Sequence, residues 1–235
     1  MEPVLFYGVP QGCSLGSIVA LEWLGQPYRL SRVEMLEHPW DVRYERVNPL
    51  YKTPALVLED GTALSQSPAI LGNLAARGID QRLGFEQGTR DFDRFNQMLA
   101  FLNCDLFSAF GPHWTLHAMP QPSAADRALL QRIGREGVAE VCAHLETLLK
   151  DRDWLLGARR TMVDAYFTGI GRWIGYFELF DLAREYPRLH AYLQRLDADP
   201  AVRFAKAIEK GEPVTGCGAF RGHLTLDELM PRLAA

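Results

Sequence analysis

Three stretches in the first third of the chain decide the fold: Tyr7-Gly8-Val9-Pro10-Gln11-Gly12-Cys13-Ser14, Asn48-Pro49-Leu50-Tyr51-Lys52-Thr53-Pro54 and Gln66-Ser67-Pro68. Each stretch alone is a weak signal, because many folds place a turn between a strand and a helix. Their order and spacing carry the prediction, together with the apolar periods of the segments that they connect.

The segments around the first stretch alternate between strand and helix periods. Residues 4–7 form a short apolar run that is typical of a buried strand. Residues 15–24 have the apolar spacing of a helix, which Gly25 stops. The next apolar run, residues 28–33, predicts a second strand.

A hairpin and a third helix are predicted after the second stretch. Asp60-Gly61 lies between the short apolar runs 54–58 and 62–64, and this pair is a strong hairpin signal. Ser67 suits an N-cap and Pro68 the first helical position, so a helix is expected over residues 68–76.

The rest of the chain has helical periods almost throughout. A helix is expected over residues 92–110, and Ser123-Ala124-Ala125-Asp126 is a capping-box-like start for a helix that reaches about Leu149. Thr161-Met162-Val163-Asp164 repeats that signature before residues 165–177, which are apolar around most of the helix circumference. Two further helices are expected over residues 189–196 and 201–208.

We therefore expect an α+β protein in three parts. Residues 1–78 form a small domain of order β-α-β-α-β-β-α, and residues 88–210 form an all-helical bundle. Residues 211–235 form a tail, in which a glycine-bearing loop leads to a terminal helical turn.

Composition restricts the class of protein. The 235 residues are 48% hydrophobic and 23% charged, which is ordinary for a soluble globular chain. A net charge of −4 argues against nucleic acid as a partner, and no apolar run approaches the roughly 18 residues that a membrane span needs. The four cysteines are scattered, which favours free thiols in the cytoplasm and no metal site.

Together, these motifs resemble those of cytosolic glutathione S-transferases, most closely the bacterial beta class. The resemblance rests on Cys-Ser before the first helix, Asn-Pro-x-x-Lys-Thr-Pro-Ala-Leu before the hairpin and Gln-Ser at the third helix. It extends to about Ile208 and includes Thr161-x-x-Asp164 and Arg172-Trp173. It implies a thioredoxin-like domain that binds glutathione, a helical domain that forms the second-substrate site, and a homodimer.

The resemblance makes Cys13, Ser14 and Tyr7 the candidates for holding or stabilising the glutathione sulfur. Cys13 precedes a helix, where unpaired backbone N–H groups favour an anion and lower a thiol pKa. The alternatives are a small buried thiol at Cys13, a simple N-cap at Ser14 and a core aromatic at Tyr7.

Two further elements are expected to bind glutathione. The resemblance makes the Thr53-Pro54 bond cis, so that the backbone of Thr53 faces the cysteinyl unit of glutathione, while Lys52 meets the glycyl carboxylate. Gln66 and Ser67 suit the γ-glutamyl end, because a helix N-terminus with a hydroxyl binds a carboxylate. Asp105 is expected to recognise the ammonium group across a dimer interface.

The sequence departs from the beta-class pattern at one position. Phe107 stands where that class has a His facing the thiol, so a general base is missing or lies elsewhere. Four aromatic residues suggest an apolar wall for a second substrate, although aromatics at helical spacing also build cores: Phe107, Phe110, Trp114 and Trp173. His113 and His117 have the i, i+4 spacing of a helix, but no Glu is adjacent to them, so a metal site is not expected. Gly169-Ile170-Gly171 lies inside a predicted helix, which favours close helix packing over nucleotide binding.

The leading hypothesis is an enzyme that binds glutathione and conjugates its thiol to a small apolar electrophile. One alternative is monothiol disulfide exchange through Cys13, and another is a partner-binding protein that kept the fold without catalysis. The sequence does not identify the electrophile or the role of the tail.

Overall fold

The computed structural model describes residues 2–233. Its N-terminal part alternates strands and helices in the predicted order, with a 3₁₀ turn, η1, between the second and third strands. These elements are β1 (Val4–Val9), α1 (Leu15–Leu24), β2 (Tyr28–Glu34), η1 (Val42–Arg46), β3 (Ala55–Val57), β4 (Ala63–Ser65) and α2 (Ser67–Arg77).

One five-stranded sheet organises this part, in the order β4-β3-β1-β2-β5. The pair β1–β2 is parallel, and β1–β3 and β3–β4 are antiparallel, so the predicted hairpin is confirmed. All ten residues of α1 are buried, and Gly25 ends the helix with a φ of 66°, the left-handed conformation that favours glycine.

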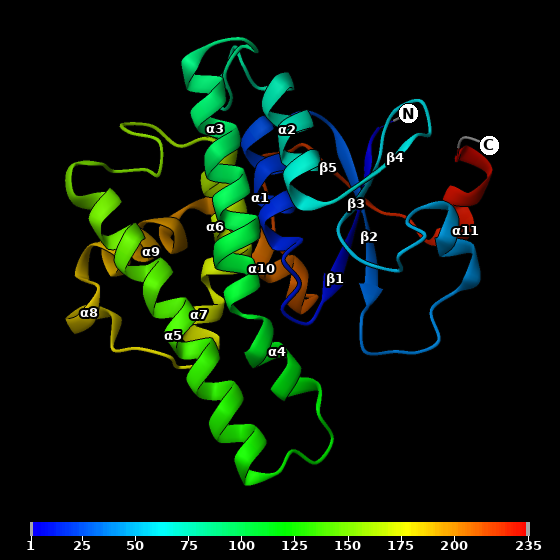
Figure 1. Cartoon of the computed structure of the whole chain (residues 1–235). Helices are drawn as coiled ribbons and strands as arrows, with labels where there is room; N and C mark the ends of the chain where they lie inside the picture. The colour runs from blue at the N-terminus through cyan, green and yellow to red at the C-terminus, as the bar shows by residue number, and fades with distance from the viewer. Residues whose placement is uncertain (1, 234–235) are drawn as a thin grey trace.

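The second part is helical, as predicted, and packs on α1 and α2 (Figure 1). Its elements are α3 (Arg90–Phe101), the π-helical turn η2 (Leu102–Phe107), α4 (Gly111–Ala118), α5 (Ala124–Leu148), the 3₁₀ turn η3 (Leu149–Asp151), α6 (Met162–Gly171), α7 (Trp173–Tyr176), α8 (Leu182–Glu185), α9 (Pro187–Ala198) and α10 (Pro200–Lys210). The helix expected over residues 92–110 is divided into α3 and η2, and the helix expected over residues 165–177 is divided into α6 and α7. Helix α4 lies beyond the first of these ranges and was not predicted.

Helix α6 is the centre of the molecule, and every one of its residues is buried. The Asp164 carboxylate accepts hydrogen bonds from the backbone N–H groups of Leu155 and Thr161 and from the Tyr192 hydroxyl, so the predicted capping box is confirmed. Gly169 lets α6 approach the start of α1, because an added Cβ would lie 2.3 Å from the Cys13 carbonyl oxygen. The interpretation of Gly169 as a helix-packing residue is therefore confirmed, whereas an added Cβ at Gly171 would meet Phe167 of the same helix.

The tail ends in the predicted helical turn, but the segment before it includes a strand that was not predicted. It returns to the N-terminal sheet and adds strand β5 (Phe220–His223) parallel to β2, before α11 (Leu226–Leu229) and a 3₁₀ turn, η4 (Met230–Arg232). In Figure 1 the red α11 lies beside the strands, away from α3 and α5. Leu224, Leu229 and Leu233 complete a second hydrophobic cluster there with Phe6 and Tyr44.

Within residues 2–233, no helix has the length and apolar character needed to cross a membrane.

Candidate active site

Three separate elements meet at the Cys13 thiol, in the turn between β1 and α1. The Sγ atom lies 3.9 Å from the Thr53 carbonyl oxygen and 3.8 Å from the Ser67 hydroxyl oxygen. The Thr53–Pro54 bond is cis, as predicted. The second and third sequence motifs are thus brought to the first, although 40 and 54 residues separate them from it.

The ionisation of Cys13 differs from the prediction. Burial raises the pKa of the Cys13 thiol above its usual value, and this outweighs the opposing effects of the Ser67 hydroxyl, the Arg172 charge and nearby backbone N–H groups. The expected lowering of the pKa by the helix terminus is therefore wrong. Cys13 is a neutral S–H group at pH 7.

The hydroxyls of Ser14 and Tyr7 have other partners. Ser14 is buried, and its Oγ accepts a hydrogen bond of 3.0 Å from the backbone N–H of Gly8 without capping α1. The Tyr7 hydroxyl lies 3.0 Å from Nε2 of His223 on the tail strand β5, and burial raises the pKa of Tyr7. Ser14 thus closes the turn between β1 and α1, and Tyr7 links β1 to the tail strand β5.

Helix α2 begins one residue earlier than predicted, which changes the role of Ser67. Gln66 is the N-cap residue, and its φ of 71° is uncommon for a residue with a side chain. Ser67 is the first helical residue and makes no side-chain cap, so the prediction of Ser67 as an N-cap is wrong. Its buried hydroxyl faces the Cys13 thiol instead.

The two predicted charged ligands lie at the surface. The backbone carbonyl of Lys52 accepts hydrogen bonds from the Tyr44 hydroxyl and the Asn48 amide, which hold the loop before the cis peptide. The ammonium of Lys52 forms no ion pair with any residue in 2–233. Asp105 lies exposed in the π-helical turn η2.

The four predicted aromatic residues form one cluster. The Trp173 ring lies 5.5 Å from Phe107, 5.4 Å from Phe110 and 5.0 Å from Trp114, measured between ring centroids. Phe110 and Trp173 are buried, whereas Phe107 is 37% exposed and Trp114 is half-buried. The indole N–H of Trp173 donates to the Gln11 carbonyl at 3.0 Å, so the cluster adjoins the turn that carries Cys13.

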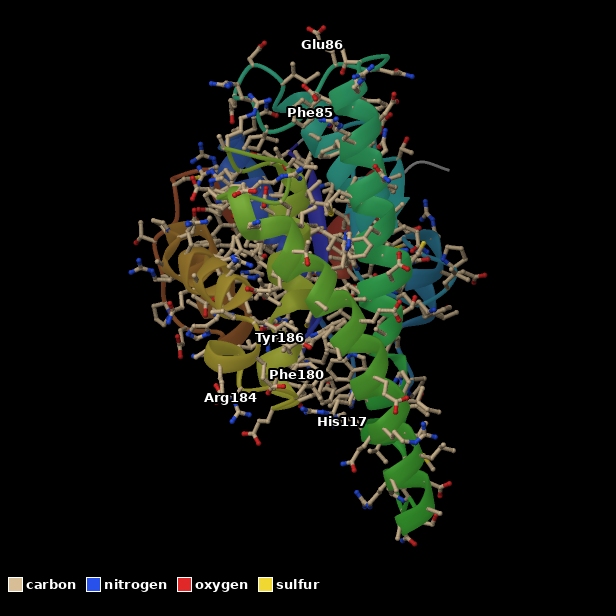
Figure 2. All side chains as sticks on the ribbon, turned by 60° about the vertical axis from the view of Figure 1, so that its left-hand side comes forward. Phe85, Glu86, His117, Phe180, Arg184 and Tyr186 are labelled. Atoms are coloured by element: carbon tan, nitrogen blue, oxygen red, sulfur yellow. The ribbon has the colours of Figure 1, made fainter. Side chains whose placement is uncertain are left out.

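The histidine pair on α4 does not form a cluster of metal ligands. His113 is buried against Gly134 of α5, whereas His117 is exposed on the side of the bundle that carries Phe180 and Tyr186, away from Phe85 and Glu86 (Figure 2). In the described part of the chain, no three His, Cys, Asp or Glu side chains are grouped so that they could hold a metal ion.

A buried ion pair behind the Cys13 turn was missed as a functional feature. Arg172 donates two hydrogen bonds, of 2.5 and 2.8 Å, to the Glu209 carboxylate and a third, of 2.9 Å, to the Gly12 carbonyl. Both side chains are 13% exposed. Arg172 drew attention only through the family resemblance, because the pairing joins residues 37 positions apart and leaves no local pattern.

Comparison with known proteins agrees with this architecture. Residues 12–77 match the family model of the glutathione S-transferase N-terminal domain, and residues 108–200 match that of the C-terminal domain. The glutathione S-transferase GST-4.5 of Xanthomonas campestris is 32% identical over 210 residues, which cover 86% of this chain and 97% of that protein. The chain belongs to the glutathione S-transferase family. The predicted fold and the predicted class of enzyme, a glutathione transferase, are thereby confirmed.

Two solved structures of this family are similar over most of their length. A sphingomonad glutathione S-transferase complexed with glutathione is 30% identical, with a TM-score of 0.76, and the match covers 88% of this chain and 98% of that one. The beta-class enzyme of Sphingomonas chungbukensis is 28% identical, with a TM-score of 0.75 and the same coverage. Both family-model matches end before the tail begins at residue 211.

Proposed function

We propose that the enzyme conjugates the thiol of glutathione to a small apolar electrophile at the site around Cys13. The observation that carries this proposal is the meeting of the Cys13 thiol, the Thr53 carbonyl and the Ser67 hydroxyl at one point. The similar sphingomonad enzyme was solved with glutathione bound, which supports glutathione as the co-substrate.

Each unit of glutathione has a matching group at this site. The γ-glutamyl carboxylate binds the Ser67 hydroxyl and the N-terminus of the 11-residue helix α2, where backbone N–H groups are unpaired. The cysteinyl unit pairs with the backbone of Thr53 next to the cis peptide, and the exposed ammonium of Lys52 meets the glycyl carboxylate. The positive φ of Gln66 sets its side chain beside the same helix end.

The raised pKa of Cys13 assigns it a donor role. A neutral S–H group donates a weak hydrogen bond to the glutathione thiolate as that anion forms, whereas an ionised Cys13 would repel it. In the reaction, glutathione releases its thiol proton to water, the sulfur forms a bond to the electrophilic carbon, and the leaving group departs with its electron pair. Cys13 itself stays unmodified.

The aromatic cluster is the wall for the electrophile. Phe107 and Trp114 present apolar surface, and buried Phe110 and Trp173 support them from behind. Trp173 joins this wall to the Cys13 turn through the Gln11 carbonyl, so the two substrates are held side by side. The protein forms a homodimer, in which Asp105 binds the ammonium group of glutathione across the interface. It acts in the cytoplasm.

Disulfide exchange through Cys13 is the second candidate reaction, supported by the half-buried free thiol. It requires a thiolate, and burial disfavours that form here. The family relationship supports an enzyme over the non-catalytic alternative.

Replacing Cys13 distinguishes the two reactions. Cys13→Ala is expected to retain conjugation of 1-chloro-2,4-dinitrobenzene at a rate reduced about tenfold, because one hydrogen bond to the thiolate is lost. Cys104→Ala is the matched control, since that thiol is exposed on η2. Intact-mass spectrometry after treatment with oxidised glutathione reports any adduct. A Cys13 adduct with disulfide reduction and no conjugation by the wild-type enzyme would overturn the proposal.

A further inference from the structure

The tail borders an open cavity of about 810 Å³ along the outer edge of β2. Strand β5 pairs with β2 only as far as Leu30, so the segment 31–34 has β1 on its inner side and no strand on its outer edge. The end of α10 and residues 211–213 line the cavity on one side, and residues 37–44 with residues 223–228 line it on the other. This volume lies within the range of roughly 300–1,000 Å³ that is typical of small-molecule sites.

The walls of the cavity are rich in aromatic and aliphatic surface. Phe6 and Trp40 each pack edge-on against Tyr44, with ring centroids 5.4 and 5.3 Å apart. Leu224 and Leu226 from the tail and Ile208 from the end of α10 add aliphatic surface. A ligand with an apolar body therefore removes much of this surface from water.

The charged groups around these walls are predominantly acidic. Five carboxylates line the cavity, from Glu34, Glu37, Asp41, Glu212 and Glu228. Three of them form ion pairs, Glu34 with Arg32, Asp41 with Arg43 and Glu212 with Lys210, and neither Arg43 nor Lys210 lines the cavity. The single guanidinium, that of Arg32, already binds Glu34 and the carbonyls of Ile208 and Glu209.

The one histidine that lines the cavity, His223, adds no cation near neutral pH. Burial and the nearby Arg32 charge lower the pKa of His223, which leaves that ring neutral. Glu37 makes no ion pair or side-chain hydrogen bond within residues 2–233. The cavity thus combines apolar walls with an excess of negative charge.

The cavity is separate from the proposed glutathione site. None of Cys13, Lys52, Thr53 and Ser67 lines it, and Tyr7 contributes through the ring whose hydroxyl faces His223. Residues 211–228 of the wall lie beyond both segments that match the family models.

We propose that the tail of this enzyme creates a second binding site, and that this site takes an organic cation with an apolar, aromatic body. The walls bury the body of the ligand, and the carboxylates attract its charge.

Two probes of nearly equal shape and opposite charge test this proposal, namely tetraphenylphosphonium and tetraphenylborate. Their binding to the full-length enzyme is measured by calorimetry with S-hexylglutathione saturating the glutathione site and the adjoining apolar wall. We expect one tetraphenylphosphonium per chain and an affinity at least about tenfold above that for tetraphenylborate.

Substitutions of two exposed carboxylates test whether the ligand binds in this cavity. Glu37→Gln with Glu212→Gln is expected to weaken tetraphenylphosphonium about fivefold for each charge removed, whereas Glu37→Lys with Glu212→Lys inverts the preference of the two probes. Glu86→Gln with Glu140→Gln is the matched control, because neither residue lines the cavity and both are exposed. Absence of binding, equal affinity for the two probes, or unchanged affinity in the Glu37 and Glu212 variants would overturn the proposal. Loss of conjugation at the Cys13 site would leave these measurements unaffected.

Discussion

Arg172→Met tests whether the buried ion pair positions the Cys13 turn. The substitution removes both hydrogen bonds to Glu209 and the bond to the Gly12 carbonyl, and it leaves a carboxylate that is only 13% exposed without its cation. Breaking a buried pair in this way costs about 3–5 kcal/mol of unfolding free energy. For a chain of this size, that loss lowers the melting temperature by about 10 °C, which calorimetry or chemical denaturation measures.

The double variant Arg172→Met with Glu209→Leu separates stability from positioning. It removes the unpaired carboxylate, so most of the lost stability is expected to return. The Gly12 carbonyl lacks its hydrogen-bond donor in both variants, so the turn that holds Cys13 loses its hydrogen bond to Arg172 at the end of α6. Glutathione affinity, measured by titration calorimetry, is therefore expected to stay about tenfold weaker in the double variant.

Two results would refute this reasoning. A single variant that loses less than about 1 kcal/mol would show that the pair is not effectively buried. A double variant that regains wild-type glutathione affinity together with its stability would show that Arg172 acts on the fold alone. Arg188→Met is the matched control, because Arg188 is 49% exposed and does not contact the Cys13 turn, and its partner Glu146 keeps hydrogen bonds from two backbone N–H groups.

Three further predictions follow from individual contacts. Ser67→Ala is expected to weaken glutathione binding by about 1–3 kcal/mol with almost no change in melting temperature, because this hydroxyl does not cap α2; wild-type affinity in calorimetry would contradict the proposed site. Lowering the pH through about 6.5 is expected to loosen the tail, since the unfolded chain protonates His223 more readily than the folded chain; trypsin cleavage after Arg221 should rise with acid in the wild type but not in His223→Gln. Asp164→Ala is expected to cost about 3 kcal/mol or more in denaturant unfolding and Asp126→Ala about 1 kcal/mol, because only the first leaves buried donors unpaired; equal losses would refute this.

Features set by neighbouring residues could be predicted from the sequence. Gly25 ends α1 because glycine adopts a left-handed backbone without strain, and Asp60-Gly61 turns the chain between β3 and β4. The Thr161 and Asp164 pair opens α6, because each side chain reaches a backbone N–H three positions away. Each of these interactions is complete within a few residues, so the sequence pattern alone carries the information.

The strand β5 could not be predicted in the same way. Phe220–His223 is short, contains Gly222 at a φ of 90° and has no apolar alternation. It becomes a strand because β2 offers unpaired backbone groups at its outer edge, and that edge exists only after the sheet has formed.

The chemical state of the site also depended on tertiary structure. Local sequence places Cys13 before a helix and predicts a lowered thiol pKa, but packing from distant segments desolvates the thiol and raises it. Tyr7 was a candidate for the glutathione sulfur until folding gave its hydroxyl a partner 216 residues away, His223. Residue types and their order determined the family, the fold and the candidate site. Burial and long-range hydrogen bonds, which exist only in the folded chain, decided which of those side chains face one another and in which protonation state.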